Sequence, residues 1–90
     1  MVEMLLYSRS YCHLCHDMEQ ALLNWQGQHP QHGFTYQVRD VDAEPAALLQ
    51  YDELVPVLLA RGDSSGEWQE ICHYFLDTTR LQAFFVPVEP

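Results

Sequence analysis

The chain has 90 residues, a length that predicts one domain covering residues 1–90. Hydrophobic residues make up 48% of it, which suffices for a packed core and excludes a wholly disordered chain. Thirteen acidic residues stand against four arginines and no lysine, for a formal net charge of −9 at pH 7. Such a charge repels phosphate backbones and anionic lipid, so we expect neither nucleic acid nor a membrane as partner.

The N-terminal segment predicts a protein that is not exported. No apolar run approaches the roughly 18 residues of a membrane span, and Glu3 stands where a signal peptide carries a basic residue. We therefore expect a cytoplasmic location, where thiols stay reduced. In that setting the three cysteines do not predict a disulfide framework, and the close pair Cys12 and Cys15 indicates redox chemistry or metal binding.

The first half of the chain predicts a strand, a helix and a second strand. The apolar run Met4–Tyr7 is typical of a strand buried on both faces. Helical spacing begins at Leu14 and stops at the breakers of the segment 27–33. The apolar stripe of this helix consists of Leu14, Cys15, Met18, Ala21, Leu22 and Trp25. The segment Phe34–Val38 alternates in polarity, which predicts a strand with Phe34, Tyr36 and Val38 on one face.

A second helix is expected next, capped by Asp42 and with Pro45 in its first turn. We expect its inner side to consist of Leu48, Leu49 and Tyr51. Two further strands, Val55–Ala60 and Trp68–His73, flank the turn-forming segment 61–66 and predict an antiparallel hairpin.

The chain closes with a short helix that Asp77 is expected to cap and that Pro87 and Pro90 end. Its predicted apolar face contains Leu81, Phe84 and Phe85. The full order is therefore β-α-β-α-β-β-α. A strand–helix–strand opening implies a parallel pair, so we expect an α/β fold with a mixed four-stranded sheet flanked by helices.

The segment Cys12-His13-Leu14-Cys15 lies where the first strand ends and the first helix begins. Cys15 shares the apolar stripe, so it is expected to point inward. Cys12 lies one turn earlier, at the helix N-terminus, where unpaired N–H groups and the helix dipole lower the pKa of a thiol. This placement predicts Cys12 as the attacking thiol and Cys15 as the thiol that resolves a mixed disulfide.

The segment from Ser8 to Cys15 resembles the active-site segment of glutaredoxins, with Arg9 three positions before the first cysteine and Tyr11 immediately before it. Val55-Pro56 resembles the cis-proline element of the thioredoxin superfamily. The resemblance implies a thioredoxin-like fold, thiol–disulfide oxidoreductase activity, a cis bond before Pro56 and substrate backbone pairing with Val55. It gives Arg9 the role of the basic residue that contacts glutathione.

The resemblance implies no bound cofactor, and electrons would come from glutathione or another thiol reductant. The expected partner is a disulfide-containing protein or a small thiol. The protein itself is expected to be a monomer. The chain departs from the family in two places. His13-Leu14 stands where Pro-Tyr is usual, and no glycine pair precedes the last helix, so we expect little preference for glutathione over other small thiols.

Several residues keep two interpretations. His13 either stabilises the Cys12 thiolate when protonated or is merely solvated, and Tyr11 either shields the site or is a partly buried loop aromatic. Cys72 is expected to be a small buried hydrophobe rather than a third redox thiol. Three other histidines are expected to be solvated: His29, His32 and His73.

The same residues allow two alternatives to redox chemistry. A zinc-binding or non-catalytic adaptor module would use Cys12, Cys15 and His16, or add Cys72 and His73 as a second pair. The sequence Cys12-x-x-Cys15-His16 also matches the attachment motif of c-type haem. Haem attachment requires export and a helical cage, and the chain shows neither pattern.

Overall fold

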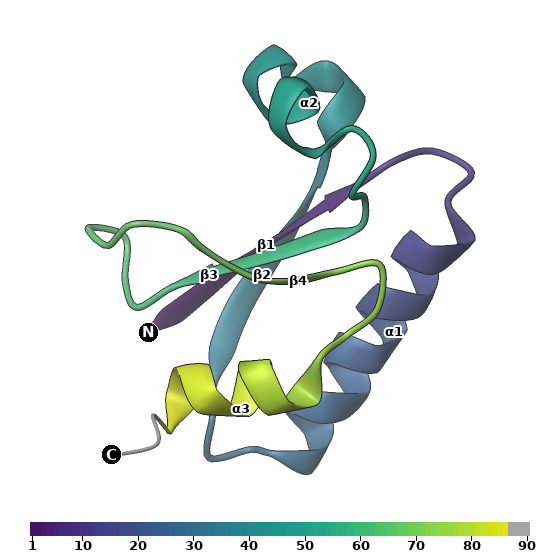
Figure 1. Cartoon of the computed structure of the whole chain (residues 1–90). Helices are drawn as coiled ribbons and strands as arrows, with labels where there is room; N and C mark the ends of the chain where they lie inside the picture. Colours follow the sequence, from purple (N-terminus) through teal and green to yellow (C-terminus); the bar gives the residue numbers. More distant parts are fainter. Residues whose placement is uncertain (87–90) are drawn as a thin grey trace.

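The computed structural model describes residues 1–86, which form a four-stranded sheet and three α-helices (Figure 1). The element order agrees with the predicted β-α-β-α-β-β-α order, with one short 3-10 turn added. The elements are β1 Val2–Ser8, α1 His13–Gln28, β2 Phe34–Asp40, η1 Val41–Ala43, α2 Pro45–Tyr51, β3 Val57–Arg61, β4 Gln69–His73 and α3 Thr78–Phe85. The expected terminators Pro87 and Pro90 lie outside the described residues. No helix within residues 1–86 is long and apolar enough to cross a membrane.

The strands follow the order β2-β1-β3-β4, so β1 and β3 are central. β1 and β2 are parallel, joined by α1 as a crossover, whereas β1–β3 and β3–β4 are antiparallel. The predicted parallel opening and closing hairpin are thus both confirmed. In the β1–β3 register Tyr7 lies opposite Val57, so the C-terminal end of β1 and the start of β3 lie side by side at the same end of the sheet.

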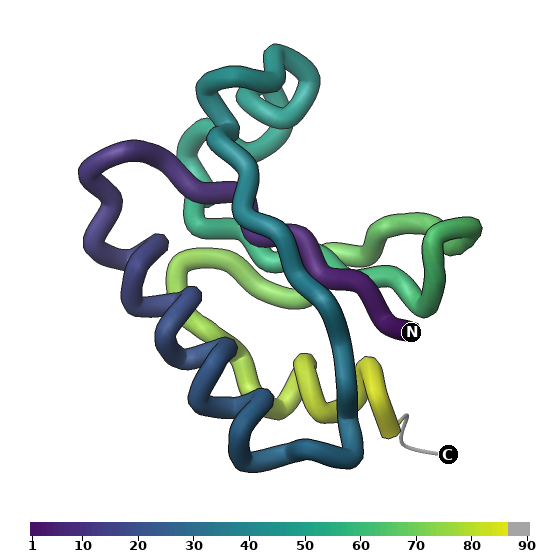
Figure 2. Tube along the Cα trace, turned by 180° about the vertical axis from the view of Figure 1, so that it is seen from behind, coloured from purple at the N-terminus to yellow at the C-terminus, as the bar shows by residue number. Residues whose placement is uncertain are grey.

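The helices cover both faces of the sheet (Figures 1 and 2), with α1 and α3 on one face and α2 on the other. β1 follows a period of two, with Met4 and Leu6 packing toward α1 and α3 and Leu5 and Tyr7 packing toward α2. This alternation explains why the whole run Met4–Tyr7 is apolar.

α1 begins where the Cys12 side chain accepts a hydrogen bond from a backbone N–H of the first turn. Its buried residues recur at steps of three and four: Cys15, Met18, Leu22 and Trp25. α3 begins in the same manner, because the Asp77 carboxylate accepts from the Arg80 backbone N–H at 3.0 Å. The sequence-based expectation that Asp77 caps this helix is confirmed.

The prediction for α2 is wrong in two respects. Asp42 does not cap it, because η1 intervenes and Glu44 is the residue that precedes Pro45. Leu49 is 91% exposed, while the buried residues are Ala47 and Tyr51. They are four apart and share one face of a helix that has only seven residues.

The expectation of solvated histidines is also wrong at the C-terminal end of α1. His29 stacks on Trp25 with ring centroids 4.2 Å apart, and its Nδ1 lies 2.9 Å from the Trp25 carbonyl oxygen. His32 stacks on Phe85, from α3, at 4.9 Å. Both imidazoles therefore belong to the aromatic packing that joins α1 to α3.

Candidate redox site

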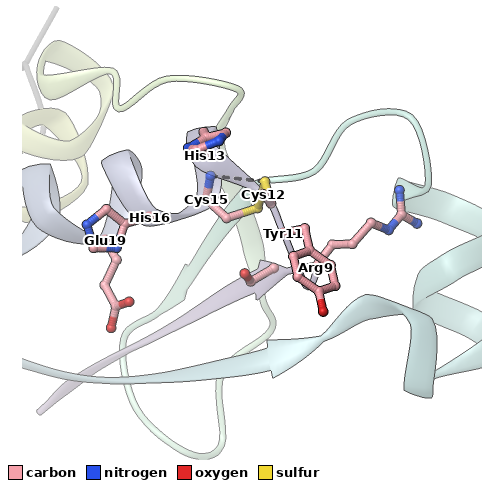
Figure 3. A pocket seen from close by; sticks show the side chains of 8 residues that line it. Arg9, Tyr11, Cys12, His13, Cys15, His16 and Glu19 are labelled. Atoms are coloured by element: carbon pink, nitrogen blue, oxygen red, sulfur yellow. Dashed lines mark hydrogen bonds between the residues drawn. A yellow bond between two sulfur atoms is a disulfide. The ribbon is translucent and has the colours of Figure 1, made fainter.

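Cys12 and Cys15 form a disulfide at the start of α1, with their Cα atoms 5.2 Å apart (Figure 3). The Cys15 backbone N–H donates to the Cys12 sulfur at an N···S distance of 3.0 Å. Cys15 is 3% exposed, whereas Cys12 is only partly buried. The two sulfurs thus differ in access, and the outer one occupies the cap position where a helix favours negative charge.

The disulfide lies in a cavity of about 420 Å³. Its lining comes from the end of β1, the loop that follows it and the first two turns of α1: Ser8, Arg9, Tyr11, Cys12, His13, Cys15, His16 and Glu19. The structure therefore brings together five residues that the sequence pointed to besides Cys15: Arg9, Tyr11, Cys12, His13 and, for the zinc and haem alternatives, His16. Val55 and Pro56 are not part of this lining.

Tyr11 and His13 flank the outer cysteine on the surface. Tyr11 is fully exposed, and its backbone adopts the left-handed conformation with φ of 59°. His13 is exposed at the first position of the helix. No described side chain covers Tyr11, so its interpretation as a partly buried loop aromatic is wrong.

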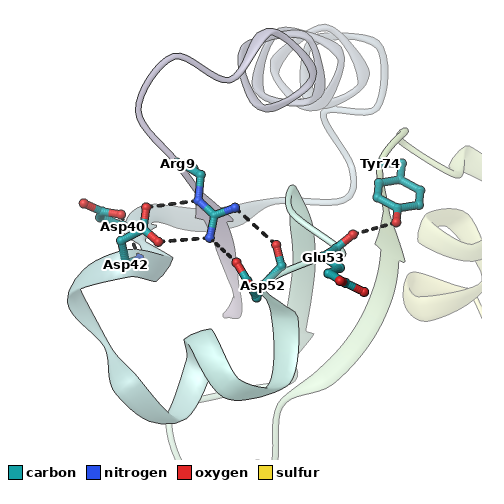
Figure 4. A network of polar contacts seen from close by, with 6 residues as sticks. All are labelled: Arg9, Asp40, Asp42, Asp52, Glu53 and Tyr74. Carbon is teal, nitrogen blue, oxygen red and sulfur yellow. Dashed lines mark hydrogen bonds and ion pairs between the residues drawn. The ribbon is translucent and has the colours of Figure 1, made fainter.

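Arg9 points away from the disulfide and into a cluster of carboxylates (Figures 3 and 4). Its Nε and Nη2 donate to the two carboxylate oxygens of Asp42 at 3.0 and 2.9 Å. Nη2 also donates to Asp52 Oδ1 at 2.6 Å, and Nη1 to the Asp52 carbonyl oxygen at 3.2 Å. These bonds, first to Asp42 and then to Asp52, raise the pKa of Arg9.

Local sequence reasoning does not find these partners of Arg9. Asp42 and Asp52 are 33 and 43 residues away along the chain. They reach Arg9 only because β1, β2 and β3 place η1 and the end of α2 at the same end of the sheet as Arg9. The surplus of carboxylates in the composition was the one available signal.

The segment that leads into β3 lies at this same end of the sheet. The Val55–Pro56 peptide bond is cis, and the Pro56 ring is fully buried. Tyr74 fixes this segment from the other side, because its backbone N–H donates to the Pro56 carbonyl at 2.9 Å and its hydroxyl to the Glu53 carbonyl at 2.6 Å (Figure 4). No sequence pattern predicted a role for Tyr74.

Cys72 is buried in β4, and burial raises the pKa of its thiol. Both observations agree with the expectation of a small buried hydrophobe. Within residues 1–86, no group of three or more His, Cys, Asp or Glu side chains is arranged to hold a metal ion. The zinc alternative therefore gains no support from the arrangement of Cys12, Cys15 and His16.

A mixed four-stranded sheet with a cysteine pair at the start of its first helix defines a thioredoxin-like α/β fold. The sequence model of the family described as Glutaredoxin-like domain (DUF836) matches residues 3–85. The chain belongs to this family. No protein with a curated description matches the chain.

Solved structures agree with this assignment. Protein Ne2328 from Nitrosomonas europaea is 28% identical, with 93% of this chain and 91% of that chain covered and a TM-score of 0.71. Oxidised mitochondrial thioredoxin 3 from Saccharomyces cerevisiae is 17% identical over 97% and 78% of the two chains, with a TM-score of 0.66. A thioredoxin from Fasciola hepatica is 16% identical over 98% and 81%, with a TM-score of 0.60. The two thioredoxins support the fold alone.

Proposed function

We propose that the protein is a thiol–disulfide oxidoreductase in which Cys12 attacks and Cys15 resolves. The observation that carries the proposal is the Cys15 N–H bond to the Cys12 sulfur at the start of a 16-residue helix. A thiolate at this position accepts a charge-assisted hydrogen bond and faces the positive end of the helix dipole. The partly buried Cys12 is also the sulfur that a substrate can reach.

The reaction balances as two exchanges. The Cys12 thiolate attacks one sulfur of a substrate disulfide, forms a mixed disulfide and expels the first substrate thiolate, which takes a proton from water. Cys15 then loses its proton to water, and its thiolate attacks the Cys12 sulfur and expels the second thiolate. Two electrons pass from the cysteine pair to the substrate, and an external thiol reductant, glutathione or another, restores the pair.

The substrate would approach over Tyr11, His13 and the segment Val55-Pro56. The positions of these segments support this approach, since the β1–β3 register places the loop after β1 beside the start of β3. In this arrangement the exposed Tyr11 ring offers an apolar surface to the substrate beside the outer sulfur, and the Val55 backbone pairs with an extended substrate.

The test compares Cys12→Ser and Cys15→Ser after reduction, with Cys72→Ala as the matched control that keeps the pair. Each protein is equilibrated in glutathione redox buffers, alkylated and weighed intact. We expect an internal disulfide in the parent and the control, a mixed disulfide in Cys15→Ser, and neither product in Cys12→Ser. Equal and slow alkylation of Cys12 and Cys15 would contradict the roles assigned here.

A further inference from the structure

Arg9 lines the cavity that holds the disulfide, yet its positive charge is already neutralised. Its guanidinium meets both oxygens of Asp42 and one of Asp52, and the side chain itself is one-third exposed. A planar guanidinium that already uses Nε, Nη1 and Nη2 has few donors left for a ligand carboxylate. An anionic substrate would have to displace one of two carboxylates that are held in place by the fold.

The other charges near the cavity do not restore a positive field. Glu19 lines it and accepts a hydrogen bond from the Tyr36 hydroxyl at 3.0 Å. With Asp42 and Asp52, this carboxylate leaves two negative charges in excess over Arg9, with the histidines counted as neutral as in the formal charge.

The remaining arginines do not line the cavity around Cys12, although Arg39 shares an adjacent pocket with Arg9 and Asp40. Arg39 faces Glu44 at 3.5 Å, and Arg61 pairs with Glu3 at 2.6 Å near the opposite end of β1. Arg80 lines a separate cavity at the start of α3, together with Asp77. Within the described chain, Arg9 is thus the only arginine in the lining of the cavity around Cys12.

From this arrangement we infer that the site takes cationic disulfides in preference to anionic ones, with Asp42 and Asp52 as the residues that set the preference. The inference rests on the proposed function and names its substrate class: a disulfide whose neighbouring groups are basic or neutral, such as one in a basic peptide segment. Oxidised glutathione, which carries net negative charge, is disfavoured. The chemical step is the attack of the Cys12 thiolate described above, and the charges act on the approach of the substrate.

The experiment uses the reduced Cys15→Ser protein, in which the reaction stops at the mixed disulfide on Cys12. Rate constants at pH 8 are measured by quenching and intact mass for cystamine, which is cationic, hydroxyethyl disulfide, which is uncharged, and oxidised glutathione. The three disulfides differ in intrinsic reactivity, so each is compared only with itself across salt concentrations and variants. Raising the ionic strength from about 0.01 to 0.5 M should slow cystamine and accelerate glutathione, each by about two- to fivefold, and leave the uncharged disulfide unchanged.

Asp42→Asn together with Asp52→Asn, in the same background, should raise the glutathione rate relative to the cystamine rate by about fivefold at low salt. The matched control is Asp63→Asn with Glu67→Gln, which removes two carboxylates from the connection between β3 and β4. Because β3 runs antiparallel to β1, this connection lies at the end of the sheet opposite Cys12. The control should move the ratio by less than half as much.

The inference is wrong if salt slows the reaction with glutathione, if the control pair shifts the ratio as much as the Asp42 and Asp52 pair, or if the latter changes the uncharged disulfide equally. The last result would assign the two carboxylates a merely structural role. A Cys15→Ser protein that reacts with none of the three disulfides overturns the proposed function, and the inference with it. The two failures therefore look different.

Discussion

The left-handed backbone at Tyr11 makes a prediction about stability with an unusual sign. Tyr11 has φ of 59° and a fully exposed side chain. For an L-residue with a side chain this conformation costs roughly 1–2 kcal/mol, which glycine does not pay. We therefore expect Tyr11→Gly to stabilise the protein, although it removes an aromatic residue.

The magnitude follows from two opposing effects. Glycine removes the roughly 1–2 kcal/mol of backbone strain, but its greater freedom in the unfolded chain costs about 0.5–1 kcal/mol. Loss of the side chain adds little, since the ring is fully exposed. The expected net gain is about 0.5–1 kcal/mol, or a rise in Tm of several degrees for a domain of this size.

The measurement is urea unfolding of the oxidised protein, with Tyr11→Ala as the matched control. Alanine removes the same ring but keeps a Cβ, so it retains the strain and should lie within about 0.5 kcal/mol of the parent. Refutation would be a Tyr11→Gly protein no more stable than Tyr11→Ala, because the left-handed conformation would then store no free energy. Strain of this kind next to Cys12 is typical of functional sites.

Three further outcomes are expected. Leu81→Ala should lower the free energy of unfolding by about 2–5 kcal/mol in urea titrations, since Leu81 is fully buried; a loss below about 1 kcal/mol would contradict its place in the core. In the reduced native protein, iodoacetamide should label the partly buried Cys12 first and reach Cys72 only after unfolding, because Cys72 is buried and its pKa is raised; labelling of Cys72 as fast as Cys12 under native conditions would show otherwise. Burial first of all raises the pKa of Tyr7, Tyr36 and Tyr51, so their contribution to stability is complete below about pH 10 and is lost as the pH rises through the higher folded-state values. Above about pH 10, the urea midpoint of Tyr51→Phe should fall less steeply with pH than that of the parent. An unchanged slope would exclude a contribution of Tyr51 to the pH dependence.

The sequence predicted those features that depend on local pattern. The two-sided burial of Met4–Tyr7, the inward stripe with Cys15 and the cap at Asp77 each follow from residues a few positions apart. For the same reason Cys12 could be placed at the helix N-terminus before its hydrogen bond to the Cys15 N–H was known.

The sequence failed where partners come from distant segments. Asp42 has the residue type of a helix cap, but its carboxylate is taken by Arg9, 33 positions away. His32 stacks on Phe85 because α3 packs next to the end of α1, and the spacing of nearby residues in the sequence does not predict this contact. Leu49 is different: the four-residue spacing of Ala47 and Tyr51 was present in the sequence and indicated the true inner face of α2.

The chain's two tryptophans lie in the two cores on opposite faces of the sheet. Trp25 belongs to α1 and lies in the core on the α1 and α3 side, stacked on His29. Trp68 packs on the α2 side, and the Arg61 guanidinium lies over its ring, 4.3 Å from the centroid. Each indole is therefore an optical reporter of one layer. Fluorescence from single-tryptophan variants can follow the melting of the two layers separately, and coincident curves would identify one cooperative unit.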